Sequence, residues 1–369
     1  KGETYLDVGL RYKGSVGAWM GCTENGGFNA GGAKTCPKLS MKVKMNWTYE
    51  DLTFHGLKKI QFHSMNNDES LMRERLSYYL FRSMGVATSR TAPARLVING
   101  KLVGLFLIVE QIDGAFSRAR FTEGGKGNVY KEVWPKHASS EIYRGALQTN
   151  EEDGSVEKMV RLANALQETD TEDLPALSDQ WIDRAYIMNY LAVDRTIKND
   201  DGAMHWYCPF AAEGIPCNPH NFFWYEATES DQLWLLPWDT DHALRTAFPT
   251  HIPVPWNQPD PDCVPKDAAL LAYVPANCDP LVWAWSTFRD DYIASVKTLL
   301  AGSFSFGNIR TLLDTWEEQI SPYVAEAHAD NPEHLSPERW QQFINELKMT
   351  IQHQREAAQA MIDEHEASQ

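Results

Sequence analysis

The stretch from Asn199 to Asp241 places acidic and amide side chains around two short apolar runs. The runs are Phe222-Phe-Trp-Tyr and Leu233-Trp-Leu-Leu, with the polar turn Thr228-Glu-Ser-Asp between them. Two apolar runs joined by a tight polar turn predict a β-hairpin. Asn221 would then stand directly before the hairpin and Asp239 just after it. Two oxygen ligands held at neighbouring ends of a hairpin suit a divalent metal and a phosphate.

A further carboxylate, Asp201, precedes the hairpin on a loop. Asp201 would orient and deprotonate an acceptor hydroxyl, while the residues at the hairpin ends hold Mg²⁺ or Mn²⁺ on the phosphates of ATP. Asp241 would be an auxiliary metal ligand. Upstream, residues 179–193 have the apolar spacing of a helix. Helix, acidic loop, hairpin and Asp is the order of parts in the C-terminal lobe of a protein kinase. Asp and Asn are also common turn residues that carry no chemistry.

The N-terminal part alternates apolar and polar residues, as β-strands do. One segment, Leu6–Tyr12, leads into a glycine-rich turn that begins at Lys13, and a second segment is Leu39–Met45. Backbone N–H groups of such a turn can approach a phosphate, which makes Lys13 and the turn candidate nucleotide contacts. A lysine on the second strand would also reach the phosphates. Lys42 and Lys44 share one face of that strand, so periodicity does not separate them, and we favour Lys42.

A helix is predicted from Asp68 to Met84, with Asp68 as its cap. Its apolar stripe is Met72, Leu76, Leu80 and Met84. Glu74 on this helix is the predicted ion-pair partner of the strand lysine, because such a pair fixes the ammonium against the phosphates. The alternative is an exposed salt-bridged face, since Arg73 and Arg75 flank Glu74.

A second hairpin is predicted at Asn99-Gly100, a strong signal for a type I′ turn. Its second strand would be buried and would lead, in a kinase-like layout, into the segment that contacts adenine. Backbone groups of residues 109–112 are therefore candidate adenine contacts, with Glu110 and Gln111 at the edge. Lys131, after Gly127-Asn-Val-Tyr, is a candidate nucleotide or substrate contact. A structural hydrogen-bonding role would also explain Glu110 and Lys131.

Six short motifs follow one another between residues 58 and 241 of the chain. They are Lys58-Lys-Ile-Gln-Phe-His, Asp68-Glu-Ser-Leu-Met-Arg-Glu-Arg-Leu, Val97-Ile-Asn-Gly, Gly104-Leu-Phe-Leu-Ile-Val-Glu-Gln-Ile-Asp, Gly127-Asn-Val-Tyr-Lys and Pro237-Trp-Asp-Thr-Asp. In this order they resemble the spore-coat CotH family of atypical kinases, and the resemblance covers about residues 5 to 320.

The resemblance implies an α+β, two-lobed kinase-like fold, with a β-rich N-lobe at residues 1–118 and a mainly helical C-lobe at residues 119–369. It also implies the use of ATP with a divalent metal and a protein substrate. The acid of the family falls on Asp201, with Asp200 as the alternative. The metal-binding Asn of the family falls on Asn221, and the first Asp of its Trp-Asp-x-Asp motif falls on Asp239.

The chain departs from the family pattern between Asp201 and His220-Asn221, where residues 206–219 are inserted. This insert would shape a substrate site, or it would displace the acid and leave a metal-binding but poorly active protein. A disulfide between Cys208 and Cys217 would make the insert an ordered element.

Six cysteines fall as three close pairs: Cys22 with Cys36, Cys208 with Cys217, and Cys263 with Cys278. Many pairings are possible, but sequential pairing is the simplest in such loops. No pair has the Cys-x-x-Cys spacing of a zinc or redox motif, so disulfides in an oxidising compartment are expected. The Asn46-Trp-Thr sequon, and a start at Lys1 rather than Met, fit a secreted, trimmed chain.

Composition sets the outer limits. With 369 residues and 43% hydrophobic content, the chain can bury a two-lobed core. Its apolar runs fall short of the roughly 18 to 20 residues of a membrane span. The net charge of −16 argues against a nucleic-acid partner. Basic substrate segments are expected, and the alternative is that the acidity serves solubility alone.

The C-terminal part is predicted to be helical at Pro280–Leu300, Asn308–Ala327 and Ser336–His365, after an irregular proline-rich loop at Pro253–Pro280. We therefore expect an ATP- and metal-dependent kinase that phosphorylates Ser or Thr hydroxyls of secreted or surface proteins. Two alternatives stay open: a pseudokinase that acts as a surface adhesion or binding module, and a kinase-like transferase that moves AMP or another group.

Overall fold

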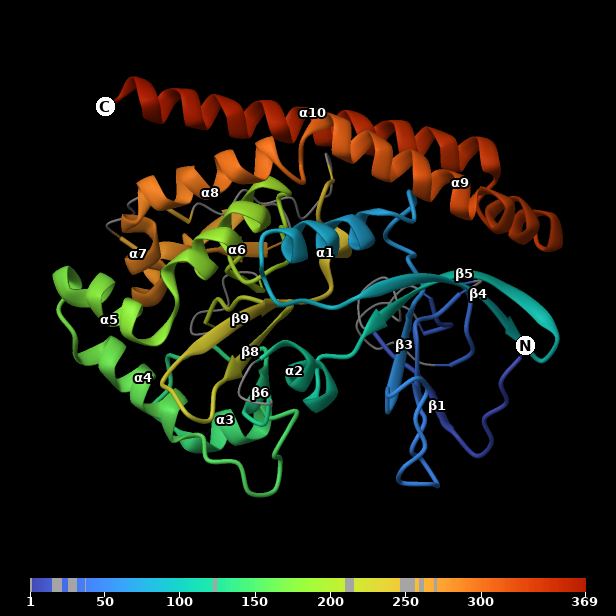
Figure 1. Ribbon diagram of the computed structural model, residues 1–369, viewed down its shortest axis with the longest axis horizontal. Helices are drawn as coiled ribbons and strands as arrows, with labels where there is room; N and C mark the ends of the chain where they lie inside the picture. Colours follow the sequence, from blue (N-terminus) through green and yellow to red (C-terminus); the bar gives the residue numbers. More distant parts are fainter. Residues whose placement is uncertain are drawn as a thin grey trace. The chain divides into compact units, whose positions relative to one another are not determined.

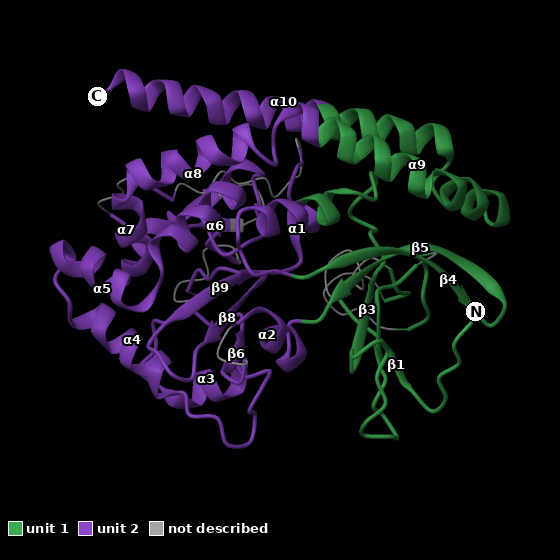
Figure 2. Ribbon diagram, in the orientation of Figure 1, with its two compact units in different colours: residues 1–76, 89–111, 309–348 green, residues 77–88, 112–308, 349–369 purple. Residues whose placement is uncertain are grey.

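The computed structural model describes residues 2–14, 22–25, 32–36, 38–121, 125–209, 216–245, 256–258, 262–268 and 271–369. The chain forms two compact units (Figure 2). Unit 1 comprises residues 1–76, 89–111 and 309–348, and unit 2 comprises residues 77–88, 112–308 and 349–369. The fold is mixed α+β with antiparallel sheets, which confirms the predicted class. The two-lobed kinase layout stays a prediction.

Unit 1 contains a five-stranded antiparallel sheet of order β1-β2-β3-β5-β4 (Figure 1). The strands are β1 Gly9–Tyr12, β2 Met41–Lys44, β3 Lys59–His63, β4 Thr91–Ile98 and β5 Lys101–Glu110. The β4–β5 turn is the predicted Asn99-Gly100, with φ of 51° and 79°. Positive φ at both central residues is the mark of a type I′ turn, so this prediction is confirmed.

Helix α1 spans Arg73–Ser83 and begins later than predicted. Leu71 has a φ of 61°, which is incompatible with a right-handed helix at that point. Asp68 still serves the helix start, because its Oδ2 accepts from the backbone N of Arg73 at 2.8 Å. The predicted apolar stripe of Met72, Leu76, Leu80 and Met84 is buried.

Unit 2 contains a three-stranded antiparallel sheet of order β6-β8-β9 (Figure 1). The strands are β6 Asn128–Lys131, β8 Phe222–Glu226 and β9 Leu233–Pro237. Strands β8 and β9 are the hairpin predicted from the two apolar runs, and every residue of β8 is buried. Helix α6 (Arg184–Thr196) packs on β9, where the hydroxyl of Tyr186 donates to the carbonyl of Leu235 at 2.9 Å.

The helices of unit 2 include α2 Gly114–Arg120, α3 Ser140–Ala146, α4 Glu157–Glu168, α5 Leu174–Trp181, α6 Arg184–Thr196, α7 Pro280–Thr287 and α8 Arg289–Ala301. The helical pattern predicted across residues 179–193 is split between α5 and α6. Ile182 is extended, and the Asp183 side chain caps α6 by accepting from the N of Tyr186 at 2.7 Å. The pattern at Pro280–Leu300 is likewise split, because Phe288 leaves helical geometry.

Helices α9 (Phe306–Asp330) and α10 (Pro337–Ala367) confirm the two C-terminal helix predictions. Each has residues in both units. No helix among the described residues has both the length and the apolar character needed to cross a bilayer.

A second small sheet of unit 2 has the order β10-β11-β7. Its strands are β7 Tyr207–Pro209, β10 Lys266–Ala268 and β11 Leu271–Tyr273. The prediction of an irregular loop at 253–280 is therefore wrong for part of that range, because β11 finds a partner in the insert that local sequence does not reveal. All three predicted disulfides are present: Cys22–Cys36, Cys208–Cys217 and Cys263–Cys278.

The predicted division into residues 1–118 and 119–369 stays a prediction about domains. The two compact units are discontinuous in sequence: unit 1 includes residues 309–348, and unit 2 includes residues 77–88. Local composition did not predict that the units are discontinuous.

Candidate active site

The β8–β9 hairpin fixes the positions of Asn221 and Asp239 in unit 2. Phe222 pairs with Pro237 at the open end of the hairpin, and the backbone N of Trp238 donates to the carbonyl of Asn221 at 3.0 Å. Asn221 directly precedes β8 and Asp239 follows Trp238. The two predicted metal ligands are therefore anchored to one ladder of backbone hydrogen bonds.

Both residues have left-handed backbone geometry, with φ of 54° at Asn221 and 49° at Asp239. Asn and Asp adopt this conformation more readily than other side chains. Glu132, after β6, has it too, with a φ of 51°, and its Oε1 accepts from the backbone N of Asn221 at 3.2 Å. The backbone N of Asp239 donates to the hydroxyl of buried Tyr78 at 2.9 Å. Left-handed residues held in place by specific partners are typical of functional sites.

Asp201 is hydrogen-bonded directly to Asn221. Its Oδ2 accepts from Nδ2 of Asn221 at 2.7 Å, and its backbone carbonyl accepts from the same nitrogen at 3.0 Å. The insert therefore does not displace the acid from the amide that follows it. The structure brings together Asp201, the predicted acid, and Asn221, whereas Asp200 acts electrostatically on the buried Asp194 and Arg195 pair.

The insert contributes Tyr207, which sequence reasoning missed. The phenol of Tyr207 donates to Oδ1 of Asp201 at 2.9 Å. Tyr207 is held in β7 opposite Tyr273, and its carbonyl accepts from the N of Asn218 at 3.1 Å. Its ring lies 4.5 Å from that of His220. Each carboxylate oxygen of Asp201 thus has its own donor.

The pKa of Asp201 is raised to about 7: burial is the largest cause, the nearby carboxylates Asp239 and Glu132 also raise it, and the hydrogen bonds from Tyr207 and Asn221 oppose the rise. Burial and Asp201 in turn raise the pKa of Tyr207 above its usual range, so the phenol stays protonated as a donor. Burial lowers the pKa of His220. A carboxyl group poised near neutrality suits a general base.

His242 is a second residue that sequence reasoning missed. It lies on the turn Thr240–His242, with Nδ1 3.9 Å from Oδ2 of Asp201 and Nε2 4.0 Å from Oδ1 of Asp241. The imidazole thus faces both the predicted acid and the predicted auxiliary ligand. Its place directly after the Trp-Asp-Thr-Asp motif was the available signal.

Lys131 joins the same group of residues through Glu132. Its Nζ lies 3.5 Å from Oε2 of Glu132, whose other oxygen binds the backbone of Asn221. Lys131 is substantially exposed, so its ammonium can reach a ligand. The role predicted for Lys131 stays a prediction.

In unit 1, the predicted phosphate-binding groups lie on the sheet and on α1. Lys42 pairs in register with Gln61 of β3, and Lys13 donates from Nζ to Oε1 of Gln61 at 2.7 Å. The same Nζ lies 2.7 Å from Nε2 of His63. The Nζ of Lys44 lies 5.5 Å from the ring of exposed Trp47.

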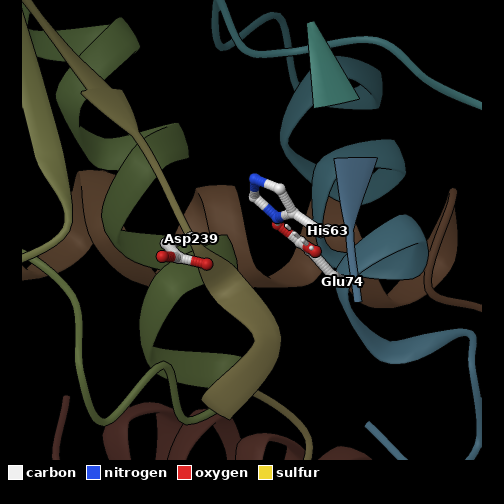
Figure 3. A group of neighbouring side chains, drawn as sticks. All are labelled: His63, Glu74 and Asp239. Carbon is white, nitrogen blue, oxygen red and sulfur yellow. Dashed lines mark hydrogen bonds and ion pairs between the residues drawn. The ribbon is translucent and has the colours of Figure 1, made fainter. Parts of the chain in front are cut away.

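Glu74 is buried against His63, with Nδ1 of His63 3.0 Å from both carboxylate oxygens (Figure 3). Lys13, His63 and Glu74 therefore form a chain of contacts within unit 1. Sequence reasoning did not single out His63, although it ends the Lys58-Lys-Ile-Gln-Phe-His motif. The predicted Lys42–Glu74 pair stays a prediction.

Glu110 has a structural partner in unit 1. Its two carboxylate oxygens accept from Nη2, Nε and the backbone N of Arg90 at 2.8–3.1 Å, and its carbonyl accepts from Ser89 Oγ at 2.8 Å. These contacts match the structural alternative stated for this residue.

A carboxylate and an amide at the ends of a hairpin, with an acid hydrogen-bonded to the amide, form the kind of arrangement that kinase-like phosphotransferases use. The chain belongs to the CotH family: the family described as CotH kinase protein matches residues 10–358.

One curated relative is the inner spore coat protein H of Bacillus subtilis (strain 168), with 23% identity over 208 residues. The aligned region covers 52% of this chain and 52% of that protein, so the chain spans about half the length of the relative. Among solved structures, a chain in the complex of the Shewanella oneidensis MR-1 toxin–antitoxin system HipA, HipB and its operator DNA shows 10% identity and a TM-score of 0.37. That match covers 89% of this chain and 65% of the other.

Proposed function

We propose that this chain transfers the γ-phosphoryl group of ATP to Ser or Thr hydroxyls of secreted or surface proteins, with Mg²⁺ or Mn²⁺. The observation that carries the proposal is the direct hydrogen bond between Asp201 and Asn221, next to the hairpin that also fixes Asp239. Membership of the CotH kinase protein family supports it. The three disulfides support an oxidising, extracytoplasmic location.

The donor set fits a hard divalent cation. Asp239 offers a carboxylate, and Asn221 keeps its amide oxygen for a ligand because its amide nitrogen is committed to Asp201. Oxygen donors of this kind suit magnesium and manganese rather than softer metals. When bound, the cation would neutralise charge on the phosphates. Asp241 is proposed as an auxiliary ligand.

Asp201 is proposed as the general base. Its two oxygens are fixed by Tyr207 and Asn221, so the carboxylate is held in one orientation before a substrate arrives. A serine or threonine hydroxyl would give its proton to this carboxylate as the hydroxyl oxygen attacks the γ-phosphorus, and the bond from that phosphorus to the β–γ bridging oxygen would break with release of ADP. Because the base is already oriented, less entropy is lost when the transition state forms.

Residues of unit 1 are proposed for the phosphates. Lys42 stays our first candidate, and Lys13, next to His63 and Gln61, is the second. Glu74 would act through His63 rather than on the nucleotide itself. Glu110 binds the guanidinium of Arg90, and its predicted place beside adenine stays a prediction.

The test is intact-mass analysis and phosphopeptide mapping after incubation with ATP and Mg²⁺ or Mn²⁺. The acceptors are dephosphorylated casein and the chain itself. We expect additions of a single phosphoryl mass on Ser or Thr that require the metal and disappear with Asp239→Asn. Additions of AMP would instead indicate an adenylyl transferase. Nucleotide binding without any transfer, or no binding, would indicate a pseudokinase or binding module.

A further inference from the structure

A cavity of about 370 Å³ lies within unit 1, and none of its lining residues is assigned to phosphoryl transfer. Its wall is largely apolar and includes Met65, Leu71, Leu105, Val324 and Leu335. Lys38 and His334 also line it. A mostly apolar cavity of this size with a few converging polar groups is the usual form of a small-molecule site.

Lys38 brings a positive charge to this wall. Its Nζ donates to the carbonyl of Leu105 at 2.9 Å and lies 5.5 Å from the centre of the Phe106 ring. In the described part of the chain, no carboxylate lies within the 4 Å of an ion pair with this nitrogen. Burial lowers the pKa of Lys38 to about 8, with Asp68 acting weakly in the opposite direction. Lys38 is half-buried, and a cation partly removed from water is normally paired, because an unpaired charge is costly there.

The sheet is distorted where Lys38 and His334 meet. Gly104 of β5 has a φ of 115°, and the β4–β5 register shifts between Leu96 and Val97, next to the pair Leu96 and Gly104. A Cβ on Gly104 would lie 3.2 Å from Cε1 of His334 and 3.4 Å from Cδ of Lys38. The glycine and the bulge therefore make room for both side chains on one side of the strand.

His334 is tied to helix α9 through its backbone. It follows α9, and its carbonyl accepts from Nδ1 of His328 at 2.9 Å. Burial lowers the pKa of His334, and Lys38 lowers it further. A neutral imidazole still carries one N–H donor, so the cavity holds donors on both of these residues.

Two carboxylates also line the cavity, and they restrict the charge of a ligand. Glu69 is tied to Nη2 of Arg73 at 3.2 Å, whereas Glu333 is exposed. A second negative charge on the ligand would meet Glu333 or Glu69. The cavity therefore fits one anionic group and an uncharged apolar remainder.

We propose that this cavity binds a small monocarboxylate with an apolar chain, its carboxylate on the Lys38 ammonium and its chain along the wall of Leu71, Leu105 and Val324. The site is independent of phosphoryl transfer. A dicarboxylate of equal length, an alcohol or an amine would bind less well.

Calorimetry and thermal shift on the full chain would test this, with hexanoate and octanoate as ligands. Binding to the folded state raises the melting temperature in a saturable way. We expect octanoate to bind more tightly than hexanoate, and Lys38→Met to weaken octanoate binding at least tenfold. Lys101→Met, on an exposed position of the same sheet, is the matched control and should leave binding unchanged. Octanol binding as tightly as octanoate, equal binding by Lys38→Met, or no saturable binding would overturn the proposal.

A second measurement on the unaltered chain does not depend on how the variant folds. Acetylation of Lys38 by an activated acetate ester is followed by peptide mass spectrometry, with Lys101 as the internal reference. Saturating octanoate should slow acetylation of Lys38 at least fivefold relative to Lys101. An unchanged ratio would overturn the proposal.

Discussion

Asn221 and Asp239 are fixed by backbone pairing, whereas Asp201 is fixed by two side chains. The hairpin register and the Trp238-to-Asn221 hydrogen bond hold the first two. Asp201 lies on a loop and is oriented by Tyr207 and Asn221. The proposed metal ligands therefore depend on a local hairpin, and the proposed base depends on partners that are distant in sequence.

This difference predicts two kinds of sensitivity. Substitution of a metal ligand should abolish the reaction without unfolding the hairpin. Damage to the supports of Asp201 should give graded losses, because each support supplies one hydrogen bond. Variants at these residues test the difference.

The largest effect is expected from Asp239→Asn. Loss of one negative charge from the proposed metal site should reduce kcat by about 10³-fold or more, since metal charge carries much of the stabilisation in phosphoryl transfer. Metal-dependent phosphorylation of casein would be measured. Asp231→Asn, at the exposed turn of the same hairpin where Asp231 pairs with Arg161, is the control and should be near wild type. Full activity of folded Asp239→Asn would contradict the assignment.

The next effect is expected from Asp201→Asn. Removing a general base should lower kcat by about 10²- to 10⁴-fold, while the affinity for ATP changes little. Steady-state kinetics with varied ATP would separate the two quantities. A loss confined to the KM for ATP would show that Asp201 acts on the nucleotide and not on the acceptor.

Tyr207→Phe removes one of the two donors to Asp201 and keeps the ring. We expect kcat to fall about tenfold with an unchanged KM for ATP, the size of one lost hydrogen bond to a charged group. Tyr273→Phe, its partner across β7 and β11, is the matched control. Equal behaviour of the two variants would mean that Tyr207 does not position the base.

A smaller effect is expected when both Cys208 and Cys217 are replaced by Ser. Strand β7 keeps its pairing with β11 and the hydrogen bond from Asn218, so Tyr207 should stay close to its place. We expect a loss of activity of about two- to fivefold and a lower melting temperature. A loss as large as that of Asp201→Asn would show that the disulfide, and not the sheet, holds the insert.

Glu226, the last residue of β8, is a titratable group that affects the stability of the fold. Burial raises the pKa of Glu226 to about 7; its Oε2 accepts from the hydroxyl of Tyr130 at 2.5 Å. The pKa of Glu226 is higher in the folded state than in the unfolded state. Its contribution to the free energy of unfolding is therefore full below about pH 4.5 and is lost as the pH rises through about 7.

Urea unfolding at pH 5 and pH 8 would test this contribution. From the lower to the higher pH, the free energy of unfolding of wild type should fall by up to about 3 kcal/mol more than that of Glu226→Gln. Glu229→Gln, in the exposed turn of the hairpin, is the control and should behave like wild type. An identical pH dependence of wild type and Glu226→Gln would contradict the prediction.

The parts of the site that sequence predicted are those encoded by local pattern. Apolar runs around a polar turn predicted β8 and β9, and Asn99-Gly100 predicted the β4–β5 turn. Close cysteine spacing predicted the three disulfides. Each of these features is formed by residues that lie close together in the sequence, within about the length of one hairpin.

The parts that sequence missed depend on long-range pairing. Tyr207 reaches Asp201 because β7 pairs with β11, more than sixty positions later in the chain. His63 meets Glu74 across a strand and a helix. The late start of α1 follows from the left-handed backbone at Leu71, which composition does not encode.

The most direct test of the central assignment is a thermal-shift titration with ATP plus Mg²⁺ or Mn²⁺, on wild type and Asp239→Ala. A ligand that binds only the folded state must raise its melting temperature. We predict a metal-dependent rise in wild type that is lost in the variant. An equal rise in Asp239→Ala, or no rise in wild type with any combination of nucleotide and metal, would contradict the assignment.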